Sequence, residues 1–231
     1  MTLIDFSQIS NTAGSQPFVT TFNQSGDPLH HAPKIVLTDN APSTVLVTEQ
    51  DQHILKLIRP RKWQEYFKLL WGHSRYQKEI KGNYMLRKIG LQVPEIYETA
   101  IGIIPTARYR YLGYYVMENL SKRGFSTLLS QFKNPDLSVD ERQQLFEKML
   151  AGLKRMKLHR IVFTDFHLEN VMVNQSGELA WIDTGITHYP WYRAHLMRGK
   201  LKKSIERLAR FHGNDFFTAH EKQSLKSLVN K

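Results

Sequence analysis

The chain has 231 residues, the length of a single domain or of one domain with two lobes. It contains no cysteine, which excludes a disulfide framework, a thiolate nucleophile and a cysteine-based zinc site. Its 32 Lys and Arg against 21 Asp and Glu give a formal net charge of +11, which favours polyanionic partners such as nucleotide phosphates, nucleic acid or an anionic lipid surface. No apolar run reaches the roughly 18 residues of a membrane span.

Residues 1–33 are polar and contain no Lys, no Arg and no long apolar core. We therefore expect no secretory signal peptide and predict a cytoplasmic location. We interpret this segment as an N-terminal extension with one strand near Pro17–Phe22. The following residues predict an antiparallel meander, with strands over Lys34–Leu37, Thr44–Thr48 and Gln52–Ile58 and a turn at Asp39–Ser43.

Residues Lys62–Ile89 have apolar positions at helical spacing. Gly72 and Gly82 weaken this pattern, so two helical pieces are expected rather than one. The buried face is predicted to carry Tyr76, Ile80 and Tyr84.

Short strands and two long helices are predicted for the rest of the chain. Ser138 and Glu141 have the spacing of a capping box, so a helix should begin there and bury Leu145, Met149, Leu153 and Met156. A basic helix is expected at Arg193–Phe211, followed by a short helical tail. Further strands are predicted at Val93–Tyr97, Gly113–Met117, Ile161–Phe163, Asn170–Val173 and Leu179–Ile182, with a strand or loop at Ile101–Tyr111. This order of elements predicts an α+β fold in two lobes with a cleft between them.

Three polar residues at the ends of short apolar pieces form the pattern that carries chemistry. Asp165 is followed five residues later by Asn170 and, after a further thirteen, by Asp183. One carboxylate can orient an attacking hydroxyl, while the amide and the second carboxylate hold Mg²⁺ on nucleotide phosphates. Kinases have this pattern, in which a catalytic-loop Asp and Asn precede an Asp-x-Gly.

Upstream, Lys56 lies inside an apolar strand, where an amine is costly to bury without a partner. In kinases that partner is the nucleotide phosphates together with a Glu from the next helix, and Glu79 is well placed for this role. Ordinary structural interpretations stay open. Asp165 could be a turn residue, Asn170 a cap, Asp183 the start of a turn, and Lys56 could extend to solvent from an edge strand.

The stretch Arg160–Gly185, followed by a basic segment, resembles the YrbL family, also known as the PhoP regulatory network protein family. This family is a small branch of the protein-kinase-like superfamily, close to the lipopolysaccharide-core kinases. The resemblance covers about residues 44–212. It implies one kinase-like domain over 34–231, bilobal, with a small antiparallel-sheet N-lobe at about 34–118 and a mainly helical C-lobe at about 119–231.

The resemblance also implies a role for each matching residue, with ATP and Mg²⁺ as cofactors. Lys56 would bind the α- and β-phosphates of ATP and Glu79 would hold Lys56. Asp165 would be the catalytic base, Asn170 and Asp183 the Mg²⁺ ligands, and Met117, Glu118 and Asn119 the hinge that binds adenine.

Departures from the kinase pattern bear on the substrate. The loop Asp39–Thr44 has no glycine where kinases have a glycine-rich phosphate loop, and Phe163 and Thr164 precede Asp165 where kinases have His-Gly or His-Arg. Thr184 is the centre of the Asp-x-Gly, and no Ala-Pro-Glu segment follows it. A small-molecule or glycolipid acceptor is therefore expected rather than a protein.

Two functions stay open at this point. The first is an ATP-dependent phosphotransferase that acts on a hydroxyl of a small molecule or of a lipopolysaccharide-core sugar. The second is a catalytically silent, YrbL-type regulatory protein in PhoP-linked envelope-stress signalling. The basic helix is either a contact with the anionic inner face of the cytoplasmic membrane or a core helix with a solvated charged face. Arginine and tyrosine alternate at 108–111, but the absence of any zinc-finger or RNA-recognition signature argues against nucleic acid.

Overall fold

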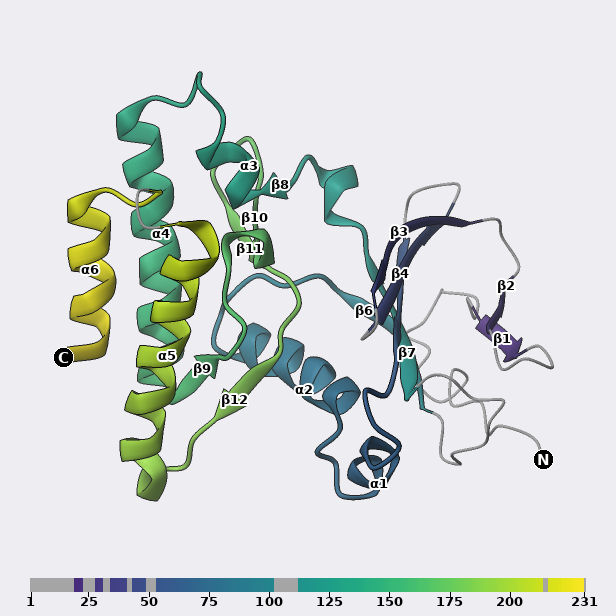
Figure 1. The fold of residues 1–231 in the computed structure, drawn as a ribbon. Helices are drawn as coiled ribbons and strands as arrows, with labels where there is room; N and C mark the ends of the chain where they lie inside the picture. Colours follow the sequence, from purple (N-terminus) through teal and green to yellow (C-terminus); the bar gives the residue numbers. More distant parts are fainter. Residues whose placement is uncertain are drawn as a thin grey trace. The chain divides into compact units, whose positions relative to one another are not determined.

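The computed structural model describes residues 19–22, 28–30, 34–40, 43–48, 53–101, 112–213 and 216–230. These residues divide into two compact units. The first unit holds the described residues up to Lys78 together with Pro94–Lys122, and the second holds Glu79–Val93 and the described residues from Arg123 onward. Helices and antiparallel strands are both present, which confirms the predicted α+β class (Figure 1). A bilobal kinase-like arrangement stays a prediction.

The first unit is built around a five-stranded antiparallel sheet with the order β3-β4-β5-β7-β6. Its central strand, β5, has Leu55, Lys56, Leu57 and Ile58 all buried, so both faces of the strand are covered. Lys56 is therefore not at the edge of the sheet. The elements of this unit are β1 (Val19–Phe22), β2 (Pro28–His30), β3 (Lys34–Asn40), β4 (Ser43–Thr48), β5 (His53–Ile58), α1 (Glu65–Leu70), β6 (Ile96–Ile101), β7 (Gly113–Glu118) and the 3₁₀ helix η1 (Leu120–Arg123), whose last residue belongs to the second unit.

The segment Lys62–Ile89 forms two helices, α1 and α2 (Arg75–Lys88), as predicted. Gly72 lies between them with a φ of +69°, a conformation that glycine adopts without steric cost. Ser74 and Gln77 then bond each other's backbone N–H groups, at 3.2 Å in both directions, which fixes the start of α2 as a capping box does. The unit boundary falls within α2, after Lys78.

The predicted buried face of α2 is confirmed at Tyr76 but wrong at Tyr84. Tyr84 is 67% exposed, whereas Glu79 and Asn83 are buried together with Tyr76 and Leu86. Hydropathy could not show this, because two of the buried side chains are polar and are stabilised by the fold around them.

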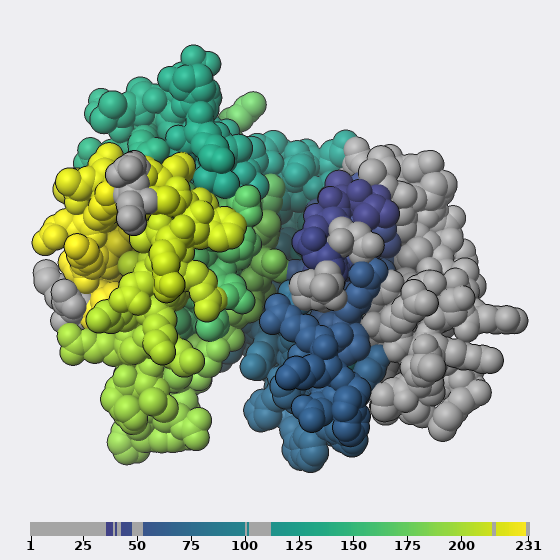
Figure 2. Space-filling model, in the orientation of Figure 1, coloured from purple at the N-terminus to yellow at the C-terminus, as the bar shows by residue number. Residues whose placement is uncertain are grey.

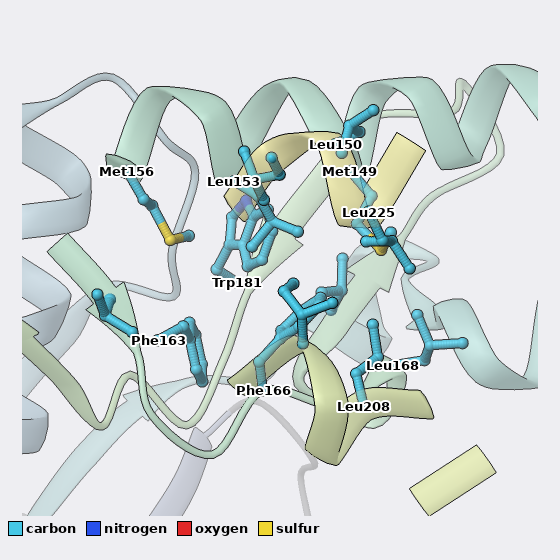
Figure 3. Packing of buried hydrophobic residues seen from close by; sticks show 14 of the residues in the cluster. Met149, Leu150, Leu153, Met156, Phe163, Phe166, Leu168, Trp181, Leu208 and Leu225 are labelled. Carbon is cyan, nitrogen blue, oxygen red and sulfur yellow. The ribbon is translucent and has the colours of Figure 1, made fainter. Parts of the chain in front are cut away.

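The second unit is a helical body with two small sheets, β11-β10-β8 and β12-β9. In Figure 3 side chains of one long helix, α4, point toward Trp181 and Phe166, whose rings lie 5.8 Å apart. Gly152 of that helix lies directly on Trp181, since a Cβ there would come within 2.5 Å of the indole. The elements are β8 (Ser126–Thr127), α3 (Leu128–Phe132), α4 (Val139–Leu158), β9 (Ile161–Phe163), η2 (Leu168–Asn170), β10 (Val171–Val173), β11 (Leu179–Trp181), β12 (Ile186–His188), η3 (Trp191–Arg193), α5 (Ala194–His212) and α6 (Ala219–Asn230).

The predicted start of α4 is confirmed. The Ser138 hydroxyl accepts a hydrogen bond from the N–H of Glu141 at 3.2 Å, and the Glu141 carboxylate accepts one from the N–H of Ser138 at 3.0 Å. The predicted stripe of Leu145, Met149, Leu153 and Met156 is buried, so the cap sets the register of the main core helix.

We expect Ser138→Ala to lower the free energy of unfolding by about 1 kcal/mol, because one N-terminal N–H of α4 loses its acceptor. Urea denaturation followed by circular dichroism measures this. Ser224→Ala is the matched control, since no hydrogen bond of the Ser224 hydroxyl is found among the described residues. An equal loss in both variants would contradict a capping role.

Candidate active site

The loop between β9 and β10 is anchored in the core by two apolar residues and exposes an aspartate, Asp165, at the surface. Phe166 and Leu168 are buried in the core of the second unit, where Figure 3 shows both. Asp165 precedes Phe166, and its side chain is 74% exposed. The alternation of apolar and polar residues therefore holds the Asp165 carboxylate at the surface on a rigid support.

Asn170 ties this loop to the next strand. Its Nδ2 donates to the carbonyl of Asp165 at 3.0 Å, and its own carbonyl accepts from the N–H of Ile182 at 2.9 Å. Asn170 is buried, while no donor to its Oδ1 is found among the described residues. The amide is thus oriented by its nitrogen and keeps its oxygen available as a ligand.

Asp183 follows Ile182 and has a φ of +55°, in the left-handed region that non-glycine residues rarely adopt. Such a conformation costs free energy and clusters at functional sites. The connection from Asn170 to Ile182 makes the Asp165 loop and the Asp183 turn parts of one hydrogen-bonded network within the second unit. The structure therefore joins the segments that carry three of the residues that the sequence singled out.

The Asp183–Gly185 turn is held against α2. The Thr184 hydroxyl donates to the carbonyl of Glu79 at 2.8 Å, and Thr184 is buried. Gly82 allows this approach, since a Cβ at that position would lie 1.9 Å from the Thr184 carbonyl oxygen. The threonine at the centre of the Asp-x-Gly, which is a departure from kinases, thus has a structural role here.

Arg207 is a site residue that the motif analysis did not single out. Its guanidinium donates to the carbonyl of Thr164 at 3.2 Å and forms an ion pair with the Asp165 carboxylate. One turn earlier in α5, Ser204 donates to the carbonyl of Phe163 at 2.6 Å, which holds the helix beside the loop. Arg207 belongs to the predicted basic helix, and its 42-residue separation from Asp165 leaves no local signal in the sequence.

Two histidines pack behind the loop. The His167 ring stacks on Phe211 with 5.0 Å between ring centroids, and its Nδ1 lies 3.6 Å from a Glu169 carboxylate oxygen. His212 accepts a hydrogen bond from the N–H of Leu168 on its Nε2 at 3.1 Å. Burial lowers the pKa of both histidines, although Glu169 acts in the opposite direction on each. The neutral form of His212 therefore fastens the end of α5 to the loop.

We expect the free energy of unfolding to fall as the pH drops below 6.5. The pKa of His167 and of His212 is lower in the folded chain, so the unfolded chain binds more protons below pH 6.5. The stabilisation that comes from keeping these two histidines neutral is therefore fully present above pH 6.5 and decreases as the pH falls below it. Urea midpoints at pH 7.5 and 5.5 measure the loss. His212→Gln, which can still accept a hydrogen bond from the N–H of Leu168, should lose less stability between pH 7.5 and 5.5 than the parent does. His220→Gln, at an exposed position, should lose as much as the parent.

The remaining predicted residues belong to the first unit, except Glu79. Lys56 is 4% exposed, and its Nζ lies 6.0 Å from the centre of the Tyr115 ring. Glu79 is also 4% exposed. Since these two residues belong to different units, their pairing stays a prediction.

The predicted hinge lies at the end of β7. The N–H of Glu118 donates to the carbonyl of Glu95 at 2.9 Å, and the Asn119 side chain accepts from the N–H of Ser121 at 3.1 Å. Met117 is opposite Ile54 and Ile96 in the sheet. Adenine binding at these residues stays a prediction.

The residues of the Asp165–Asp183 network suit Mg²⁺. Among the described residues no group of three or more His, Cys, Asp or Glu is placed to hold a metal ion. Mg²⁺ on a nucleotide needs fewer protein ligands, because phosphate oxygens and water complete its octahedron. The Asn170 amide oxygen and the Asp183 carboxylate are of the required type.

Two pockets lie wholly within the second unit, with volumes of about 310 and 410 Å³. Both are lined by Lys148 and Gly177, and neither contains Asp165 or Asp183. The candidate site is therefore separate from both.

The basic helix, α5, buries its apolar side. Leu201, Ile205 and Leu208 belong to the core of the second unit, and the lysines lie on the exposed side. Its lysines thus remain accessible to an anionic partner, while Leu201, Ile205 and Leu208 do not. None of the helices in the described part of the chain is long and apolar enough to cross a bilayer.

A comparison with protein-family models finds no match, and a comparison with curated proteins finds no relative. Membership of the YrbL family therefore stays a prediction that depends on the residues quoted above.

Proposed function

We propose that the chain is an ATP- and Mg²⁺-dependent phosphotransferase that acts on a hydroxyl of a small molecule or of a lipopolysaccharide-core sugar. The observation that supports this best is the network in which Asn170 bonds Asp165 through its side chain and Ile182 through its backbone. It connects the segments that carry Asp165, Asn170 and Asp183, which are the residue types that phosphoryl transfer uses.

Each residue has a part in this proposal. Asp165 accepts the proton of the acceptor hydroxyl, and Asn170 and Asp183 hold Mg²⁺, which when bound neutralises charge on the phosphates. Lys56 binds the α- and β-phosphates and is held by Glu79, and adenine binds at Met117–Asn119.

A YrbL-type, catalytically silent regulator is the second candidate, and the Arg207 ion pair favours it. A base whose carboxylate is held by a guanidinium must be released before it can accept a proton. In the phosphotransferase the acceptor would have to displace Arg207 from Asp165. We further propose that the protein works in the cytoplasm, in peripheral contact with anionic lipid of the inner membrane face through its basic segments.

Asp165→Asn separates the two candidates. An active enzyme should consume ATP slowly even without its acceptor, and loss of the base should reduce this rate by about 10²–10⁴-fold while Mg²⁺-ATP still binds. Release of inorganic phosphate and calorimetric titration measure the two quantities. A parent protein that binds Mg²⁺-ATP without turnover would support the silent regulator.

A further inference from the structure

The short helix α1 exposes an apolar face. Trp63, just before the helix, is 65% exposed, and Phe67, Leu70 and Trp71 are 44%, 68% and 67% exposed. Their spacing of four, three and one residues places them on one side of a helix. The Trp63 and Phe67 rings lie 5.3 Å apart, edge to face. Figure 2 shows the blue segment that contains α1 at the surface of the molecule.

This face is held in place rather than frayed. On the opposite side of α1, Tyr66 and Leu69 are buried. The Leu69 carbonyl accepts from Gln77 Nε2 at 2.9 Å, and the N–H of His73 donates to the Lys68 carbonyl at 2.9 Å. The aromatic residues are thus presented outward by a fixed support.

Cations surround the apolar face. Arg61, Lys62 and Lys68 are exposed, and residues 59–75 contain five Lys or Arg and a single acid, Glu65. The Glu65 carboxylate accepts from the N–H of Arg61 at 3.2 Å, so it is engaged locally. Tryptophan flanked by lysine and arginine is the composition of an element that lies in the interface of an anionic bilayer.

The charge favours a lipid surface over a second copy of the chain. Two copies that met through this face would bring like charges together. Four apolar side chains exposed to this degree offer about 400–500 Å², roughly half of the 800 Å² per partner that a stable interface buries. An anionic bilayer satisfies the apolar residues and the cations at the same time.

We propose that α1 is the element through which the protein docks on an anionic membrane, with Trp63, Phe67, Leu70 and Trp71 in the headgroup region and Lys62 and Lys68 on anionic headgroups. This assigns a surface to the membrane contact proposed above. It is independent of phosphoryl transfer, because α1 contains none of the candidate site residues.

Co-sedimentation with vesicles of phosphatidylcholine containing 30% phosphatidylglycerol tests the proposal in two ways. Lys62→Glu with Lys68→Glu should weaken binding at least about tenfold, and Trp63→Ser with Trp71→Ser should do the same. Vesicles of phosphatidylcholine alone should bind little. In a Trp191→Phe background, brominated lipids should quench tryptophan fluorescence, because Trp181 is buried and only Trp63 and Trp71 remain exposed.

Matched variants control for net charge and for exposed aromatic surface. Lys154→Glu with Lys226→Glu changes the same net charge on exposed residues elsewhere, and Tyr84→Ser removes another exposed aromatic residue. Both should bind anionic vesicles as the parent does. Undiminished binding by the α1 variants would overturn the proposal, and so would a dimer that the Trp63 and Trp71 changes dissociate. Titration with Mg²⁺-ATP on the same variants should be unchanged, which keeps this outcome separate from that of the proposed phosphotransferase.

Discussion

Gly82→Ala is expected to damage the candidate site more than a methyl group normally would. The new Cβ would lie 1.9 Å from the Thr184 carbonyl oxygen, so this oxygen or the helix must move by about 1 Å to reach an allowed contact. Alanine gains about 1 kcal/mol over glycine in a helix, but overpacking against backbone costs about 1–3 kcal/mol or more. We expect a net loss of stability and a displaced Asp183–Gly185 turn.

We expect Gly82→Ala to reduce ATP binding more than it reduces the stability of the fold. A displacement of 1 Å at a reacting group can cost about 10²-fold, so Mg²⁺-dependent ATP binding should fall by about that factor. Gly199→Ala in α5 is the matched control, because nothing lies within 4 Å of the added Cβ, and it should stabilise the chain slightly. Calorimetric titration and urea denaturation measure the two effects. Equal behaviour of the two variants would show that α2 does not hold the turn.

Asp183→Ala should remove the Mg²⁺-dependent part of ATP binding. Substituting a residue that only hydrogen-bonds to a metal ligand typically lowers the affinity for the metal by about 10–100-fold. Loss of the ligand itself should therefore raise the Kd for Mg²⁺-ATP at least about a hundredfold. Asp183→Asn tests the same point with less effect on the backbone, since Asn adopts the left-handed conformation readily. Asp136→Ala, at an exposed turn, is the control and should bind as the parent does. Unchanged affinity in both Asp183 variants would leave Asp183 as an ordinary turn residue.

Elements with local signals were predicted well from the sequence. The α4 helix was predicted from its Ser138 cap and its apolar stripe, and most central strands were predicted within one or two residues. Strand β6 begins at Ile96 rather than at the predicted Val93. Most of the predicted segment Ile101–Tyr111 lies outside the described residues. The elements β8, α3 and β12 were not predicted, because runs of two to five residues have no periodicity and are defined by their long-range partners.

The candidate site divides in the same way. The order Asp165, Asn170 and Asp183 was visible in the sequence, but the bond from Asn170 to the Asp165 carbonyl depends on how β9 and β10 approach each other. Arg207 and Gly82 act on the site from helices distant in sequence, so only tertiary structure identifies them. The exposed face of α1 could not be predicted from hydropathy, because the buried residues Tyr66 and Leu69 are no more apolar than the residues of α1 that face solvent.

The most direct test is a titration of the parent chain with ATP, in the presence of Mg²⁺ and again in excess EDTA. The proposed phosphotransferase predicts saturable binding of one nucleotide with Mg²⁺ and at least tenfold weaker binding without it, because Asn170 and Asp183 then hold no ion. Absence of ATP binding under both conditions, or binding that Mg²⁺ does not change, would contradict the assignment of Asp165, Asn170 and Asp183 to phosphoryl transfer.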